Sequence, residues 1–150
     1  FCNRIGLLKS RNIHAYGEEM IQRYHILCKD PETPISSLSG GNIQKVVLAR
    51  ELSSNPEIII ANQTTRGVDV GATEFIRHEL LALRDSGKYV FLVSSDLNEL
   101  LGLSDRLLVM CNGKISAYFP DAAKVTEEEL GRYMLGIDRQ SEEEIQEAAK

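Results

Sequence analysis

The stretch Leu38-Ser39-Gly40-Gly41-Asn42-Ile43-Gln44-Lys45 decides the fold of this chain. It places a hydroxyl and two glycines at the start of a helix that the sequence predicts from about Asn42 to Ser53. The first-turn amides of a helix lack partners within the helix and carry partial positive charge. Glycine lets a phosphate approach the backbone closely, so the segment predicts a site for a terminal phosphate. The alternative is a helix that is merely capped by Ser39 and preceded by a flexible glycine pair.

Helices and strands alternate on both sides of this stretch. Apolar side chains at helical spacing predict a helix from Ile13 to Leu27, which Asp30-Pro31 separates from the glycine-rich segment. The continuous apolar run Ile58–Ala61 predicts a strand that is buried on both faces. Further elements are expected at Thr73–Asp85 (helix), Tyr89–Val93 (strand), Asp96–Leu103 (helix), Arg106–Cys111 and Lys114–Phe119 (a hairpin around Asn112-Gly113), and from Thr126 onward (helix), with an acidic tail that is either helical or frayed. This order indicates an α/β fold with a mostly parallel sheet.

Composition excludes some classes of function. The chain has 150 residues, a formal net charge of -5 and a pI near 5.3, which argues against a nucleic-acid-binding surface. No apolar run approaches the roughly 20 residues of a membrane span. The 3 cysteines show no CxxC spacing, and the histidines show no metal-like spacing, so we expect reduced cysteines and no metal site.

Residues 35–71 resemble the ATP-binding-cassette family, and the resemblance continues to about residue 120. In that family an LSGGQ-like signature opens a helix, an apolar strand follows, and a loop then ends in an aspartate. Here the same order is Leu38 to Gln44, Ile58–Ala61, and the loop that ends in Asp69. The Asn at 42 and the run Thr65-Arg-Gly-Val-Asp-Val-Gly-Ala72 look like the branch that imports simple sugars. The resemblance implies a partial P-loop NTPase fold, with a helical signature subdomain first and a hairpin and helix last.

Two positions at a strand end and one beyond the next strand depart from the family pattern. The family has Asp-Glu after the first strand, where this chain has Asn62 and Gln63, and a histidine where this chain has Ser95. An amide cannot accept a proton as a general base, and serine cannot carry the charge of an imidazolium. Drift at tolerant positions is the alternative, but the loss of all three groups together predicts a degenerate ATP site.

The resemblance also implies which residues contact nucleotide. In the family, ATP lies between two cassettes, each site joining one cassette's phosphate loop to the other's signature. The expected contacts here are Ser39, Gly40, Gly41, Asn42, Gln44 and Asp69, and an aspartate at position 41 would face the terminal phosphate. The intact protein would use ATP and Mg²⁺. The chain shows no G-x-x-x-x-G-K-[ST] loop, so we expect no tightly bound nucleotide and no hydrolysis by this chain alone.

The hypothesis is therefore the C-terminal part of one cassette, the second of two, in a bacterial importer of simple sugars or nucleosides. Within it we expect a helical signature region (1–54), a sheet region (55–120) and C-terminal helices (121–150). Its partners would be the first cassette, in the same chain or a dimer mate, a membrane permease and, indirectly, an extracellular solute-binding protein. The expected place is the cytoplasmic face of the bacterial plasma membrane. Gln63 weakly favours nucleosides.

Two other classes of protein remain open from the sequence. One is a soluble ATP-binding-cassette protein with no role in transport, against which the stretch from Thr65 to Ala72 speaks. The other is an interaction module with no nucleotide role, against which the intact Ser39, Gly40 and Gly41 speak.

Overall fold

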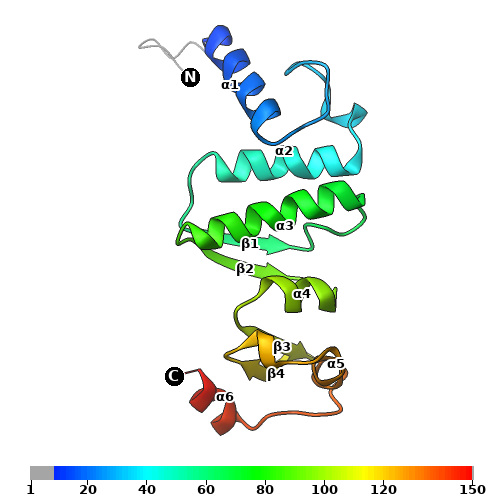
Figure 1. Ribbon diagram of the computed structural model, residues 1–150, viewed down its shortest axis with the longest axis vertical. Helices are drawn as coiled ribbons and strands as arrows, with labels where there is room; N and C mark the ends of the chain where they lie inside the picture. The colour runs from blue at the N-terminus through cyan, green and yellow to red at the C-terminus, as the bar shows by residue number, and fades with distance from the viewer. Residues whose placement is uncertain (1–8, 150) are drawn as a thin grey trace. The chain divides into compact units, whose positions relative to one another are not determined.

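The computed structural model describes residues 9–149 (Figure 1). Its larger elements are, in order, α1 (Ser10–Arg23), α2 (Gly40–Leu52), β1 (Ile58–Asn62), α3 (Val70–Asp85), β2 (Tyr89–Val93), α4 (Leu97–Leu103), β3 (Leu107–Cys111), β4 (Lys114–Phe119), α5 (Glu127–Met134) and α6 (Glu142–Ala148). Two short 3₁₀ turns, Ile35–Ser37 and Ala122–Lys124, join them. The described residues form two compact units, one up to Ile59 with Thr64–Val90, the other 60–63 with 91–149.

The first unit is built on α1, α2 and α3, and α2 packs along α3 (Figure 1). Its core consists of Tyr24, Ile26, Leu48 and Ala49. Phe75 of α3 meets the ring of Tyr24 edge-on, with the ring centroids 6.4 Å apart. Because Tyr24 is buried, the pKa of its hydroxyl is raised. This aromatic contact fixes α3 against the segment that follows α1.

The apolar spacing predicted that the first helix would end at Leu27, but it ends at Arg23. The chain turns at His25, whose φ of 50° lies in the left-handed region. This turn buries Tyr24 and Ile26 and leaves Leu27 exposed. Lys45 holds the turn from α2, because its Nζ donates to the His25 carbonyl oxygen at 3.0 Å and lies 5.0 Å from the centre of the Phe75 ring.

The strands β1 and β2 form a two-stranded parallel sheet. Tyr89 N donates to Glu57 O at one end, and Gln63 N donates to Val93 O at the other. The prediction that Ile58–Ala61 is buried on both faces is wrong, since Ile58 and Ile60 are 59% and 73% exposed. Side chains alternate across a strand, and among the described residues only one of the two faces of β1 is covered.

The second unit is built on the antiparallel hairpin β3–β4, with α5 packed against it. Its core consists of Leu107, Val109, Ala117, Ala122 and Leu130. The negative charges of the three acidic residues in the first turn of α5 stabilise the positive N-terminal end of this helix. Thr126 caps the same end, because its Oγ1 accepts from Glu129 N at 3.2 Å. The hairpin predicted around Asn112-Gly113 is confirmed, with both residues at positive φ.

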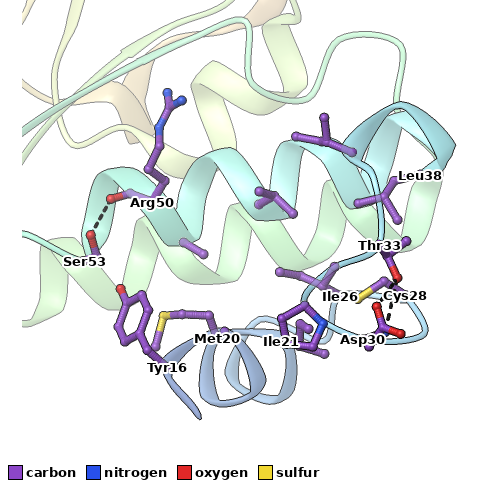
Figure 2. Close-up of a pocket in the computed structure, with 15 residues that line it drawn as sticks. Tyr16, Met20, Ile21, Ile26, Cys28, Asp30, Thr33, Leu38, Arg50 and Ser53 are labelled. Carbon is purple, nitrogen blue, oxygen red and sulfur yellow. Dashed lines mark hydrogen bonds between the residues drawn. The ribbon is translucent and has the colours of Figure 1, made fainter. Parts of the chain in front are cut away.

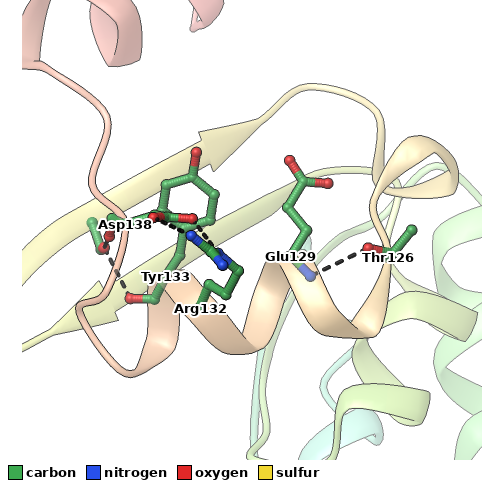
Figure 3. Close-up of polar contacts among 6 residues, drawn as sticks. Thr126, Glu129, Arg132, Tyr133 and Asp138 are labelled. Carbon is green, nitrogen blue, oxygen red and sulfur yellow. Dashed lines mark hydrogen bonds and ion pairs between the residues drawn. The ribbon is translucent and has the colours of Figure 1, made fainter.

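Polar contacts hold the end of α5 to the hairpin (Figure 3). Ser116 Oγ, on β4, donates to Tyr133 O at 2.9 Å. The Arg132 guanidinium donates to both carboxylate oxygens of Asp138, at 2.5 and 2.9 Å, and lowers the pKa of that carboxyl. The stabilisation from this pair is present at neutral pH and is lost as the pH falls through the lowered pKa of Asp138.

Candidate functional site

The glycine-rich segment lies at the N-terminus of α2. Ser39 is the N-cap residue, in extended conformation, and its Oγ accepts from Asn42 N at 3.4 Å. No acceptor within residues 9–149 is recorded for the N–H groups of Gly40 and Gly41. Ser39 and Gly40 are exposed, whereas Gly41 is buried, so the Ser39 hydroxyl and the Gly40 N–H are the open donors at the positive end of this helix. This arrangement suits a phosphate oxygen.

Gly41 has a different role from Gly40, because its missing side chain faces α3. A Cβ at position 41 would lie 2.5 Å from Asp69 Oδ2 and 2.7 Å from the Cβ of Ala72. A Cβ at position 40 would meet only the Gly67 carbonyl oxygen, at 3.9 Å. An aspartate at position 41, which the sequence analysis expects to face a phosphate, would begin its side chain in the contact between α2 and α3.

Asp69 is the N-cap residue of α3, where its Oδ1 accepts from Ala72 N at 2.9 Å. The same carboxylate lies against Gly41, so the structure brings the glycine-rich segment and the loop that ends in Asp69 together in the first unit. Asp69 is also exposed.

The remaining predicted contacts on α2 are Asn42 and Gln44. Asn42 is engaged within the chain, because its Nδ2 donates to Ser39 Oγ at 2.8 Å and its Oδ1 accepts from Leu27 N at 2.8 Å. Gln44 is half-buried, and no hydrogen bond of its side chain is recorded within the described part of the chain. Asn42 lies beside Ser39, but its bond with Leu27 joins residues 15 apart and has no local sequence signal.

The three departures from the family pattern belong to the second unit. Asn62 ends β1, and Gln63 follows it at a φ of 52° with its N–H bonded to Val93 O at the end of β2. Ser95 is exposed two residues beyond Val93. Asn62 and Gln63 offer amide oxygens and Ser95 offers a hydroxyl, and none of the three carries a carboxylate. Such a donor set does not fit a magnesium ion, which prefers charged oxygen ligands, nor does it hold a general base.

A mostly apolar cavity of about 400 Å³ opens between α1 and α2 (Figure 2). Its walls include Met20 and Ile21 of α1 and Val46 and Ala49 of α2. Gly17 allows Pro31 to approach α1 closely, since a Cβ at position 17 would lie 2.8 Å from the Cβ of Pro31. The polar groups at its rim bond to one another: Thr33 Oγ1 donates to Asp30 at 3.0 Å, and Ser53 Oγ donates to the Arg50 carbonyl oxygen at 2.6 Å. The cavity therefore presents mostly apolar surface, with the free thiol of Cys28 in its lining.

Two features are absent from residues 9–149. No helix among them combines the length and the apolar character needed to cross a bilayer. No group of three or more His, Cys, Asp or Glu side chains among them is arranged to hold a metal ion.

Comparison with curated proteins finds import ATP-binding proteins. The chain is 41% identical over 132 residues to the guanosine import ATP-binding protein NupO of Bacillus subtilis, covering 88% of this chain and 26% of that protein. It is 38% identical over 134 residues to the nucleoside import ATP-binding protein NupA of Lactococcus lactis, covering 89% and 26%. The chain thus spans about a quarter of the length of these relatives and matches their C-terminal part. No protein-family model matches.

Comparison with solved structures finds cassettes. The dimeric bacterial ABC transporter cassette MJ0796 matches with a TM-score of 0.63 and 25% identity, over 75% of this chain and 49% of that one. An inward-facing transporter of the metal-chelate type, at 15% identity, shares the fold with a TM-score of 0.68 over 90% of this chain and 53% of that one. The predicted partial P-loop NTPase fold with a parallel sheet is confirmed.

Proposed function

Because this chain belongs to the ATP-binding-cassette ATPases of sugar and nucleoside importers, we propose that it supplies the signature segment to the ATP site of a partner cassette. The main supporting observation is the group of donors at the start of α2, in which the Ser39 hydroxyl and the Gly40 N–H belong to exposed residues. When bound, ATP supplies the anionic terminal phosphate. This chain's residues orient and stabilise that phosphate from one side.

The structural fit supports a phosphate at this place. Gly40 leaves the approach to the backbone open, because even an added Cβ would meet only one atom, at 3.9 Å. Hydrogen bonds from a hydroxyl and from backbone amides to an anion are stronger than those to a neutral acceptor. Asp69, whose carboxylate lies against Gly41, would contact the partner cassette from the adjoining loop.

We further propose that the chain's own ATP site is degenerate. The strand ends carry Asn62 and Gln63, which cannot act as a general base, and the exposed Ser95 replaces an imidazole. The chain would then bind no nucleotide tightly by itself. It would act as a binding partner that completes an active site whose phosphate loop and base belong to the other cassette.

The partners follow from the same proposal. They are a first cassette, in the same polypeptide or a dimer mate, a membrane permease and, indirectly, an extracellular solute-binding protein. The complex would work at the cytoplasmic face of a bacterial plasma membrane, with ATP and Mg²⁺ at the shared site. The two relatives described above are named for guanosine and nucleoside import, which supports a nucleoside more than a simple sugar as the solute.

Replacement of Ser39 by alanine should weaken nucleotide-dependent association with a cassette that carries a phosphate loop. The affinity is measured by fluorescence anisotropy with labelled chain and a non-hydrolysable Mg-ATP analogue. Since a hydrogen bond to a charged group contributes about 1.5–3 kcal/mol, Ser39→Ala should raise Kd by roughly tenfold to a hundredfold. Ser36→Ala is the matched control, because Ser36 is exposed and lies outside the donor group.

Gln63→Ala separates the two sites in the same assay. Under the proposal it changes Kd less than twofold, because its side chain belongs to the degenerate site. The proposal is overturned by the reverse pattern, with loss of association in Gln63→Ala and none in Ser39→Ala. Association that is equally strong without nucleotide would instead favour an interaction module with no nucleotide role.

A further inference from the structure

Asn42 joins the glycine-rich segment to the turn after α1. Its Oδ1 accepts from Leu27 N at 2.8 Å, and its Nδ2 donates to Ser39 Oγ at 2.8 Å. Leu27 lies between Ile26 and Cys28, which both line the apolar cavity. The Asn42 side chain is half-buried and spans these two points with both of its polar atoms engaged.

The orientation of the Asn42 amide is fixed by chemistry. A backbone N–H can only donate, so the atom that faces Leu27 must be the amide oxygen. The amide nitrogen therefore faces Ser39 Oγ and can only donate to it. The reverse orientation would set two donors against each other at Leu27.

The orientation of the Ser39 hydroxyl follows. Its oxygen accepts two hydrogen bonds, one from Asn42 Nδ2 at 2.8 Å and one from Asn42 N at 3.4 Å. A hydroxyl oxygen has two lone pairs, so both are engaged and the proton must point elsewhere. No acceptor for that proton is recorded within residues 9–149, and Ser39 is exposed. The hydroxyl is thus held as an outward donor.

We propose that Asn42 is a positioning residue that fixes Ser39 as a hydrogen-bond donor, through a one-way chain from Leu27 N–H to Asn42 to Ser39. The inference rests on the proposed function, in which Ser39 donates to the terminal phosphate of ATP. It replaces the expectation that Asn42 contacts nucleotide directly. Successive bonds in one direction polarise one another, so the amide also strengthens the donor.

The decisive variant is Asn42→Asp, which has nearly the same shape. An ionised carboxylate can accept from Leu27 N–H but cannot donate to Ser39. The Ser39 proton would then turn inward to the carboxylate, and the oxygen would present lone pairs to the phosphate. With the Mg-ATP analogue and phosphate-loop cassette described above, we expect Asn42→Asp to raise Kd by roughly a hundredfold, from both the lost donor and the added charge.

A double-mutant cycle separates two effects of Asn42→Asp on Kd, the reorientation of the Ser39 hydroxyl and the added negative charge. Asn42→Asp is measured in the Ser39→Ala background, where no hydroxyl remains to be turned. We expect its effect there to be at least fivefold smaller than in the Ser39 background. Asn42→Leu, which adds no charge, should raise Kd by about threefold to tenfold with Ser39 present and by less than twofold in the Ser39→Ala background.

The controls test the fold and the charge. Asn12→Asp, an amide-to-acid change at an exposed position of α1, should leave Kd unchanged. Circular dichroism and urea unfolding of each variant verify the fold. If Asn42→Asp is unfolded, the double-mutant cycle of Asn42→Leu and Ser39→Ala tests the proposal instead. Additive effects of the substitutions at 39 and 42 would overturn the positioning role. No effect of Ser39→Ala by itself would overturn the proposed function instead.

Discussion

Gly41→Ala is expected to lower the free energy of unfolding of this chain by about 1–3 kcal/mol, the usual cost of overpacking a tight contact. The new Cβ would lie 2.5 Å from Asp69 Oδ2 and 2.7 Å from the Cβ of Ala72, so α2 and α3 must move apart. Gly41→Asp should cost more than about 3 kcal/mol, because it also buries a second carboxylate against the Asp69 side chain. Urea unfolding followed by circular dichroism measures both.

Gly40→Ala is the matched control for this prediction. Its Cβ would meet only the Gly67 carbonyl oxygen, at 3.9 Å, which is an ordinary contact distance. Alanine is a better helix former than glycine by about 1 kcal/mol, so Gly40→Ala should be neutral or slightly stabilising. Equal stability of Gly40→Ala and Gly41→Ala would contradict the packing of Gly41 against α3.

Leu130→Ala should lower the free energy of unfolding of the second unit by about 2–5 kcal/mol. The Leu130 side chain is 1% exposed and packs in the core that α5 forms with the hairpin β3–β4. Alanine would leave a cavity that the antiparallel strands can fill only in part. Thermal unfolding, monitored by the fluorescence of Tyr133 and the other tyrosines and by circular dichroism, measures the change.

Leu135→Ala provides a control of the same chemistry five residues later. The Leu135 side chain is 76% exposed at the end of α5, so its truncation should change stability by less than about 0.5 kcal/mol. If both substitutions destabilise the protein equally, then the core of the second unit does not lie where the structure places it.

Short-range patterns predicted most of the elements. The strand Tyr89–Val93 and the hairpin strand Lys114–Phe119 have the predicted bounds, because turn residues flank both. The first helix was predicted four residues too long at its C-terminus, since Leu27 continues the apolar spacing although the chain has already turned at His25. That turn depends on Lys45, 20 residues away, which no local pattern shows.

The sequence predicted only part of the candidate site, because local patterns do not show contacts between distant segments. The order of residues placed Ser39 and Gly40 at a helix N-terminus, and the structure confirms that position. The direction of a Cβ at Gly41 depends on how α3 packs, and the role of Asn42 depends on a backbone group in another segment. Both are properties of tertiary packing. The exposed face of β1 was missed because an unbroken apolar run gives no information on which side is covered.

The bond from Leu27 to Asn42 gives this protein a built-in spectroscopic reporter. The Leu27 side chain is 76% exposed, and its backbone proton is held by a side chain of α2 and by no helix or strand. The exchange of that single proton with deuterated solvent therefore depends on whether Asn42 is in place. The nuclear magnetic resonance signal of the Leu27 amide would therefore report whether Asn42 is in place in the glycine-rich segment. No label near Ser39 would be needed.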